Sequence, residues 1–360
     1  MANKVIPIYK PFIDKTEEDL VTDCMKSTWI SSKGDYINKF EEQIKEYTNA
    51  GYCTTTSSGT SALHLAMLAL NIGKDDEVIT TNFTYVASTN AILFVGAKPV
   101  FCNIRSEDLN IDVDSIESKI TSKTKAILYT NVYGFLCDYD RLNEIAKKHG
   151  LFLIEDAAES FGATYKNIIS GNLGDISTFS FFGNKTITTG EGGMVLCKNL
   201  QHYNKIIKLK NQGNSETTYF HDILGYNYRM TNIQAAIGVG QLNKVDKIIS
   251  LKRRLYHNYK SILESKVRFI KELEGTEPSY WMTPIILDSQ SQKEKVETKL
   301  KDNSIETRPL FTPIDELPFY EKSTCETAKR IYKLGILLPS YPDLSEEDQN
   351  KICKIINSTI

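Results

Sequence analysis

The chain has 360 residues, which is enough for about two domains of ordinary size. Hydrophobic residues make up 41% and charged residues 24% of the sequence, a balance that excludes both a disordered chain and an integral membrane protein. The 45 acidic and 43 basic residues give a net charge of -2, so the sequence offers no broad positive surface for a nucleic acid.

The first ten residues contain no apolar stretch of the kind found in secretory signals, and no run approaches the roughly 20 apolar residues of a membrane helix. We therefore expect a cytoplasmic protein that does not bind membranes. The seven cysteines lack CxxC spacing and the five histidines lack HExxH spacing. We predict reduced, packed thiols and no metal site.

Short β-branched or apolar runs alternate with helical periodicity over the first two thirds of the chain. In residues 61–70, apolar side chains recur at the spacing of one helical face. Strands are predicted at residues 77–81, 99–104, 125–131, 151–155, 176–181 and 193–197. This order predicts a wide, mainly parallel, doubly wound α/β sheet, in which ligands bind at the carboxyl ends of the strands.

The sequence changes in character after about residue 245. A charged helix is predicted over 252–264, strands over 267–270 and 280–287, a second charged helix over 293–301, and a last helix over 345–356 with Ser345 as its N-cap. We therefore predict a large domain, residues 1–245, followed by a smaller α+β domain, residues 246–360.

The most informative segment runs from Ser180 to Gly193 and reads SFFGNKTITTGEGG. It places Lys185 between an apolar strand and a glycine-rich turn, where burial lowers the pKa of an ammonium group and makes the amine nucleophilic. A Schiff base to such a lysine is how enzymes hold pyridoxal 5'-phosphate (PLP). A surface lysine in a flexible turn explains this segment equally well on its own.

Asp156 ends the apolar run LFLIED and is suited to face the pyridine nitrogen of PLP, which needs a carboxylate to stay protonated. Glu155 points to the opposite face because side chains alternate along a strand, so only one of the two carboxylates should face the ligand. The alternative is that Asp156 caps the following turn, residues 157–161.

A cofactor phosphate needs backbone amides and hydroxyl groups, and residues 54–61, TTTSSGTS, supply both just before an apolar helix. Many such turns are simple helix caps and bind nothing. Ser180 adds a further hydroxyl group. Tyr85 follows a predicted strand, where its ring could cover the pyridine, with Phe83 as the competing choice and core packing as the alternative for both.

These motifs together identify a resemblance that extends almost end to end. The chain resembles the DegT/DnrJ/EryC1/StrS sugar aminotransferases, which are PLP enzymes of the aspartate aminotransferase-like fold (fold type I), and within that group it most resembles the GDP-perosamine synthases. The matching stretches are residues 27–34 (STWISSKG), 58–65 (SGTSALHL), 154–159 (IEDAAE), 177–194 (STFSFFGNKTITTGEGGM), 225–233 (GYNYRMTNI) and 306–309 (ETRP).

The resemblance implies PLP as cofactor, Lys185 as the Schiff-base lysine and Asp156 as the partner of the pyridine nitrogen. It implies that Asn227 reaches the phosphate of a neighbouring subunit, so a homodimer with shared active sites is expected. The remaining cofactor contacts would be Gly59, Thr60, Tyr85, Glu159 and Ser180. The substrate contacts would be Trp29, Ser31, Arg229 and Arg308, whose arginines suit a pyrophosphate; core packing of the tryptophan and surface pairing of the arginines are the alternatives.

Two positions depart from the pattern of relatives. Residues 129–134 read YTNVYG, where perosamine synthases tend to have HLYG, which puts the details of substrate contact in doubt. Glu159 stands where many relatives carry Gln or His, although perosamine synthases share the Glu.

The implied reaction uses L-glutamate to aminate C4 of a nucleotide-linked 4-keto-6-deoxy sugar, with Lys185 as both anchor and general acid/base. The product would be a 4-amino-4,6-dideoxy sugar of the GDP-perosamine type. UDP- or dTDP-4-keto-6-deoxyglucose, giving viosamine, is the alternative substrate, and amination at C3 is another. Removal of a hydroxyl group by dehydration is a further alternative, but related dehydratases replace the lysine with histidine, so the presence of Lys185 argues against it. A non-catalytic regulatory or scaffold relative is the alternative from another class.

Overall fold

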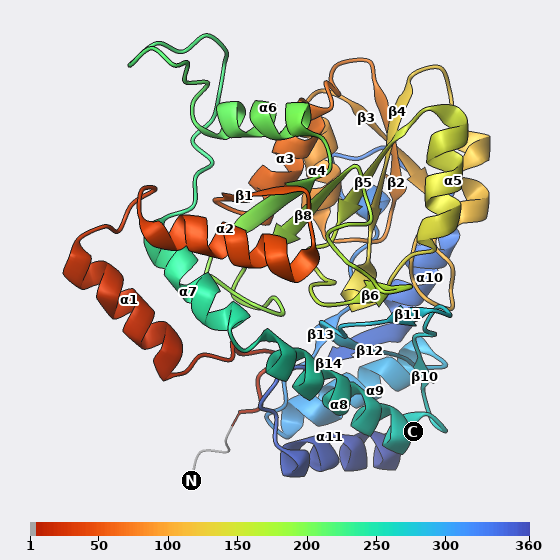
Figure 1. The fold of residues 1–360 in the computed structure, drawn as a ribbon. Coiled ribbons are helices and arrows are strands. Elements are labelled where there is room, and N and C mark those ends of the chain that lie inside the picture. Colours follow the sequence, from red (N-terminus) through yellow and green to blue (C-terminus); the bar gives the residue numbers. More distant parts are fainter. Residues whose placement is uncertain (1–4) are drawn as a thin grey trace.

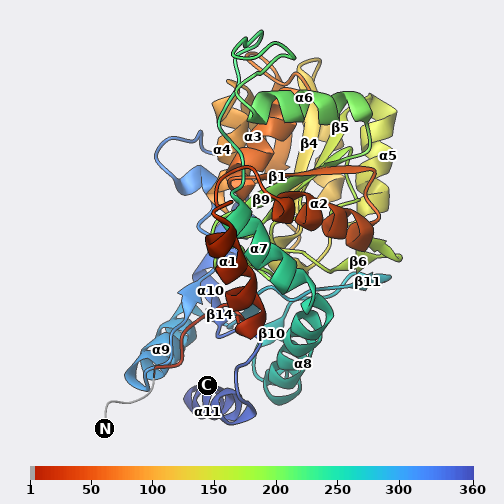
Figure 2. The same cartoon turned by 60° about the vertical axis from the view of Figure 1, so that its left-hand side comes forward.

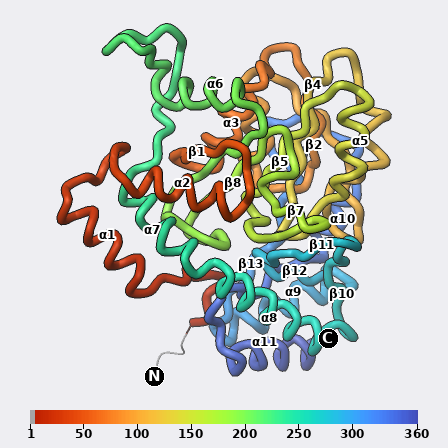
Figure 3. Tube along the Cα trace, viewed as in Figure 1, coloured from red at the N-terminus to blue at the C-terminus, as the bar shows by residue number. Residues whose placement is uncertain are grey.

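The computed structural model describes residues 5–360, so the first four residues of the predicted large domain lie outside the described chain. A large central sheet with helices on both faces sits above a smaller sheet that packs against a second group of helices (Figure 1). The same arrangement can be followed along the Cα trace, where the segment after α6 projects from the body of the protein (Figure 3).

The central sheet has seven strands in the order β1-β9-β8-β5-β4-β2-β3. Their bounds are β1 (Tyr52–Thr56), β2 (Glu77–Thr81), β3 (Lys98–Cys102), β4 (Thr124–Thr130), β5 (Phe152–Asp156), β8 (Ile176–Ser180) and β9 (Gly193–Cys197). Strand β9 is antiparallel to both of its neighbours, and the other pairs are parallel. The predicted α/β class with a mostly parallel sheet is confirmed, and each predicted strand of this region is present within two residues.

Strand β1 is an error of the sequence prediction, which placed residues 54–56 in a turn. These three threonines are buried in an outer strand of the sheet. Their polar side chains are tolerated there because Glu41 accepts hydrogen bonds from the hydroxyl groups of Thr54 and Thr55 and from the Thr55 amide.

Helices cover both faces of the central sheet, as the two-sided apolar pattern of its strands requires. Val78, Leu128 and Ile154 face α3, α4 and α6, whereas Ile79 and Phe179 face the opposite side. The first group is α3 (Gly59–Ala69), α4 (Val86–Phe94) and α6 (Leu200–Lys210), and the second is α2 (Asp35–Thr48), α5 (Tyr139–His149) and α7 (Asn232–Leu242). Helix α1 (Lys15–Ser27) lies against α7 (Figure 2).

The smaller sheet is antiparallel, with the order β10-β12-β14-β13. Its strands are β10 (Arg268–Phe269), β12 (Thr283–Ile286), β13 (Arg308–Pro309) and β14 (Gly335–Leu338), and its helices are α8 (Val245–Leu263), α9 (Gln290–Asp302), α10 (Glu326–Leu334) and α11 (Glu346–Thr359). Ser345 caps α11 as predicted, because its hydroxyl oxygen accepts from the Asp348 amide. Helix α8 begins at Val245, but the domain boundary there stays a prediction.

Short elements complete the described chain. A third sheet has the order β11-β6-β7 and joins β6 (Thr164–Tyr165) and β7 (Ile168–Ile169) to β11 (Thr276–Glu277). Single 3-10 turns cover Val113–Ser115, Glu117–Lys119, Val132–Gly134 and Ile314–Glu316. The seven cysteines are buried and free, as predicted. Within residues 5–360, no helix combines the length and apolar character needed to cross a membrane.

Candidate active site

A cavity of about 810 Å³ opens where the carboxyl ends of β1, β2, β5 and β8 meet the smaller sheet. Parallel strands bring residues that are distant in sequence to this edge, which is where ligands bind in such folds. Eight of the residues predicted for the site line it: Gly59, Thr60, Tyr85, Asp156, Glu159, Ser180, Lys185 and Arg308. The other four, Trp29, Ser31, Asn227 and Arg229, are not among the described residues that line it.

Lys185 lies in the turn that follows β8, and its side chain is buried in the cavity wall. Its Nζ is 3.9 Å from Oε1 of Glu159 and 3.8 Å from the centre of the Trp281 ring. Burial lowers the pKa of Lys185 against the opposing effect of Glu159. The alternative of a solvated surface lysine is therefore wrong, and the side chain has the low-pKa surroundings that a nucleophilic amine needs.

Asp156 is the last residue of β5 and reaches the same cavity. Its Oδ2 accepts a hydrogen bond from Ser88 Oγ at 2.5 Å, and its Oδ1 accepts from the Ala158 amide at 3.1 Å. Asp156 thus caps the following turn and also lines the cavity, so the capping role does not exclude a role toward a ligand. Burial raises the pKa of Asp156, while the bond from Ser88 offsets part of this effect. Nothing in the local sequence pointed to Ser88, which comes from α4.

Glu155 faces the other side of the sheet, as strand alternation predicts. Its carboxylate is fully buried and accepts five hydrogen bonds at 2.7 to 3.0 Å. The donors are the side chains of Asn131, Ser170 and Ser177 and the amides of Gly171 and Leu173. This carboxylate therefore holds together the loops behind the sheet and does not take part in the cavity.

Glu159 is buried beside Lys185, and its Oε2 accepts a hydrogen bond from the Tyr133 amide at 2.7 Å. Tyr133 has a φ of 56°, in the left-handed region that non-glycine residues rarely adopt. Burial raises the pKa of Glu159 to about 7, and the nearby Lys185 ammonium opposes the rise. Glu159 and Lys185 thus form a buried ion-pair contact in which each group shifts the pKa of the other. The divergent segment 129–134 contributes to the site through the backbone of Tyr133.

The start of α3 forms a corner of the cavity that is suited to an anion. Ser58 caps the helix by accepting from the Ser61 amide, while the amides of Gly59 and Thr60 occupy the first turn, where no intrahelical acceptor exists. A Cβ on Gly59 would lie 2.7 Å from the Cβ of Ser180, so only glycine allows this close approach of α3 to the end of β8. The geometry favours a bound anion at this point.

The structure distinguishes Tyr85 from Phe83, the two aromatic residues predicted as candidates to cover one face of the ligand. Tyr85 is 58% exposed and lines the cavity. Phe83 is fully buried and packs edge-on against Tyr133 and Phe311. Tyr85 is therefore the ring available to a ligand, and Phe83 belongs to the core.

Three of the remaining predicted residues, Trp29, Ser31 and Arg229, lie near the start of α7, where Asn232 binds the backbones of the first two. The side-chain Nδ2 of Asn232 donates a hydrogen bond to the carbonyl oxygen of Trp29, and its backbone N–H donates one to the carbonyl oxygen of Ser31. Arg229 donates through Nε to Ser32 Oγ at 3.1 Å. Trp29 is 59% exposed, so the core-packing alternative for it is wrong. Asn227 is exposed on the segment that follows α6.

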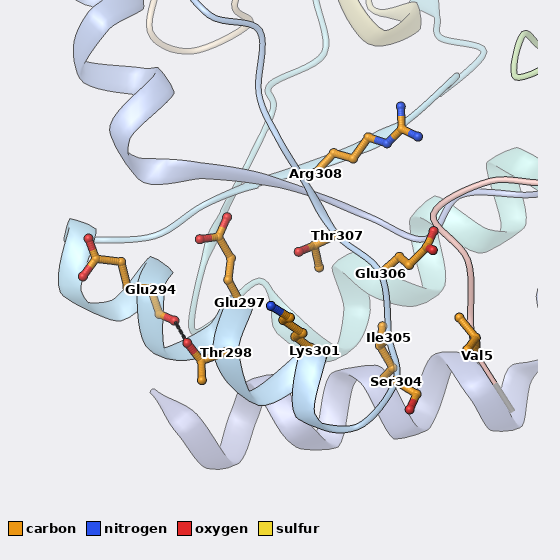
Figure 4. Close-up of a pocket in the computed structure, with 10 residues that line it drawn as sticks. All are labelled: Val5, Glu294, Glu297, Thr298, Lys301, Ser304, Ile305, Glu306, Thr307 and Arg308. Carbon is orange, nitrogen blue, oxygen red and sulfur yellow. Dashed lines mark hydrogen bonds between the residues drawn. The ribbon is translucent and has the colours of Figure 1, made fainter. Parts of the chain in front are cut away.

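Arg308 also borders a second, open cavity of about 670 Å³ between α9 and β13 (Figure 4). Figure 4 shows its guanidinium group pointing away from the carboxylates of Glu294 and Glu297 in that cavity. No other predicted site residue borders it among the residues described. The cavity that contains Lys185 is therefore the candidate active site.

Comparisons with known proteins agree with this geometry. The model of the DegT/DnrJ/EryC1/StrS aminotransferase family matches residues 11–357. The chain is 47% identical to the GDP-perosamine synthase of Escherichia coli O157:H7 over 98% of each protein, and 46% identical to that of Vibrio cholerae over 98% of this chain and 99% of the relative. It is also similar in structure to the aminotransferase PseC of Helicobacter pylori, with a TM-score of 0.93 and 26% identity over 99% of each chain.

Proposed function

This chain belongs to the DegT/DnrJ/EryC1/StrS aminotransferase family, and we propose that it uses L-glutamate to aminate C4 of GDP-4-keto-6-deoxymannose, giving GDP-perosamine. It is a PLP-dependent sugar aminotransferase. The observation that carries the proposal is the joint placement of Lys185, Asp156 and the start of α3 around one cavity. The relatives named GDP-perosamine synthase support the choice of nucleotide and sugar.

The residues of the cavity fit PLP. The amides at the start of α3 and the hydroxyl groups of Thr60 and Ser180 suit its phosphate, and Tyr85 is available to cover its ring. When bound, PLP supplies an electron-withdrawing ring that stabilises negative charge on the carbon from which a proton is removed. The buried carboxylate of Asp156, oriented by Ser88, would keep a proton on the ring nitrogen.

Lys185 would hold the cofactor covalently through Nζ and, once released, act as the general base and acid. An amine whose pKa is lowered by burial is suited to take a proton from the donor substrate in one half of the reaction and to deliver a proton to the sugar in the other half. Glu159, 3.9 Å away, would hold a proton near Nζ during this exchange. Arg308 would meet the pyrophosphate from the smaller sheet.

A homodimer with shared sites is part of the proposal. Four predicted contacts, namely Trp29, Ser31, Asn227 and Arg229, lie outside the cavity of their own chain. Trp29 and Asn227 are exposed. Residues on such a surface can reach the cavity of a second copy, and a two-fold interface would complete both sites at once.

A panel of nucleotide-linked 4-keto-6-deoxy sugars tests the function directly. The purified protein, loaded with PLP and supplied with L-glutamate, should convert the GDP-linked mannose derivative into a 4-amino sugar identified by mass and NMR. Lys185→Ala should give no product. Preferred conversion of the UDP- or dTDP-linked glucose derivative would move the assignment to viosamine. If PLP binds and L-glutamate changes neither its spectrum nor any sugar, the protein is a non-catalytic relative.

A further inference from the structure

The turn that carries Lys185 is held by two hydrogen bonds from distant parts of the chain. The indole Nε1 of Trp281 donates to the carbonyl oxygen of Asn184 at 2.6 Å. The hydroxyl group of Tyr9 donates to the carbonyl oxygen of Lys185 itself at 2.8 Å. Burial raises the pKa of Tyr9 well above its usual range, so its hydroxyl group remains a donor. These two bonds hold the two peptide units that flank the Cα of Lys185.

Both donors are anchored to the smaller sheet. Trp281 lies two residues before β12, whose first residue, Thr283, donates through its amide to Ser340 Oγ at 2.9 Å. Ile8, the neighbour of Tyr9, accepts at its carbonyl oxygen from the Ser340 amide at 3.0 Å. Ser340 therefore joins the two segments that hold the lysine turn.

A buried lysine fixes the same junction from the other side. Lys252 of α8 donates through Nζ to the carbonyl oxygen of Ser340 at 2.6 Å, and this Nζ is 5.1 Å from the centre of the Tyr9 ring. The Tyr9 ring is thus held between the smaller sheet and α8. Its hydroxyl group has little freedom to leave the Lys185 carbonyl.

The indole of Trp281 also faces the Lys185 side chain. The 3.8 Å from Nζ to the ring centre is well within the range of a cation–π interaction. The indole is stacked at 24° on Tyr133, which is stacked in turn at 16° on Phe311. This row of three rings resists any tilt of the indole away from the ammonium group.

We propose that Tyr9 and Trp281 are positioning residues for Lys185: their hydrogen bonds hold its turn, and the indole face stabilises its ammonium group whenever the side chain is not bound to the cofactor. The inference rests on the proposed function only in taking Lys185 as the reactive lysine. Neither residue is among the contacts assigned above to cofactor or substrate. A shift of the smaller sheet would move both donors together and with them the lysine.

The test uses the full-length protein without cofactor. The rate at which a water-soluble anhydride acetylates Lys185 is measured against pH by mass spectrometry, and amide hydrogen exchange is followed in the peptide containing residues 183–187. Trp281→Leu removes the indole face and should move the acetylation midpoint of Lys185 down by roughly 0.5 to 1.5 pH units. Tyr9→Phe removes only the hydroxyl group and should speed exchange in the turn without moving the midpoint. Tyr332→Phe, on α10, is the matched control and should change neither.

An unchanged midpoint in Trp281→Leu, or turn exchange in Tyr9→Phe as slow as in Tyr332→Phe, would overturn the inference. If Trp281→Leu does not fold, Trp281→Phe replaces it, since it keeps a ring in the core but lacks the N–H donor. In Trp281→Phe, faster amide hydrogen exchange in residues 183–187 supports the inference, and an exchange rate equal to that of the parent protein rejects it. No readout involves PLP or a sugar, so these results are independent of whether the proposed reaction is correct.

Discussion

Glu155 and Asp156 are adjacent on β5 but face opposite sides of the sheet, so the isosteric amides Glu155→Gln and Asp156→Asn should fail in different ways. Glu155 accepts five hydrogen bonds behind the sheet and touches no part of the cavity. Asp156 accepts only two and lines the cavity. We expect the first substitution to lower stability and the second to lower activity.

The cost of Glu155→Gln follows from its donors. A glutamine keeps one oxygen, which can still accept from the amides of Gly171 and Leu173, but its NH2 group then faces the donors Ser170 and Asn131. The Ser170 hydroxyl group can rotate to accept. Asn131 cannot turn its amide without losing the bond that its Oδ1 accepts from the Cys137 amide. One lost bond to a charged group, with weakening of the others, costs about 2 to 4 kcal/mol in the free energy of unfolding.

Thermal unfolding of the cofactor-free protein measures this cost. Glu155→Gln should lower Tm by roughly 4 to 8 °C, given about 2 °C per kcal/mol for a chain of this size. The Tm of Asp156→Asn should stay close to that of the parent protein. Its Oδ1 can still accept from the Ala158 amide, and Ser88 can turn its hydroxyl group toward the Tyr85 carbonyl oxygen. Its transamination rate should fall by about 100-fold or more, as for loss of a group that controls a proton.

The reasoning is refuted if Glu155→Gln has the same Tm as the parent protein, since the five hydrogen bonds would then contribute nothing to stability. It is also refuted if Asp156→Asn is destabilised as much as Glu155→Gln, because the two faces of the strand would not have separate roles.

Three further predictions concern the cavity. Burial raises the pKa of Glu159 from 4.5 to about 7, so the unfolded state loses this proton first as pH rises, and the folded protein should lose up to about 3 kcal/mol of stability between those values. Glu159→Gln should lack this fall. The free energy of unfolding is measured with urea at several pH values, and an equal change with pH in both proteins would contradict the prediction. A methyl group on Gly59 would lie 2.7 Å from the Cβ of Ser180, so Gly59→Ala should weaken PLP binding by roughly 10- to 100-fold in equilibrium dialysis; unchanged affinity would mean that the phosphate lies elsewhere. Lys185→Ala and Asn227→Ala should each lose activity, and a mixture of the two chains, unfolded and refolded together, should recover about a quarter of the parental rate, because half of the dimers would carry one intact site; no recovery would argue against shared sites.

Local patterns in the sequence were sufficient for most of the central sheet. The other six strands of the central sheet each carry two or more Val, Ile, Leu or Phe residues, because helices cover both faces, and such segments can be recognised without knowing their partners. Strand β1 has none of these residues and three threonines in a row, yet Thr54 and Thr55 are buried. Their burial depends on Glu41, which comes from a separate helix, and no local pattern reveals such a partner.

The same limit applies to the site. Asp156 ends a strand and Lys185 lies in the glycine-rich turn after one, so both could be singled out from their flanking residues. Ser88 is 68 residues from Asp156, and Trp281 and Tyr9 contact the lysine turn from 97 and 176 residues away. Their roles arise only when the chain folds, because a serine in a helix, a tryptophan before a strand and a tyrosine near the start of a chain have many ordinary uses.

The distant contacts also explain why the smaller sheet matters to chemistry that takes place on the larger one. It carries Arg308 on β13, which borders the cavity, and it anchors the two donors that hold Lys185. Phe311, three residues beyond Arg308, stacks on Tyr133, whose amide binds Glu159. In the proposed function, Arg308 binds the substrate from the same sheet that positions the lysine turn and, through Tyr133, its carboxylate neighbour. Because these contacts form one continuous packed unit, we expect the position of the substrate and the position of the Lys185 amine to be set together.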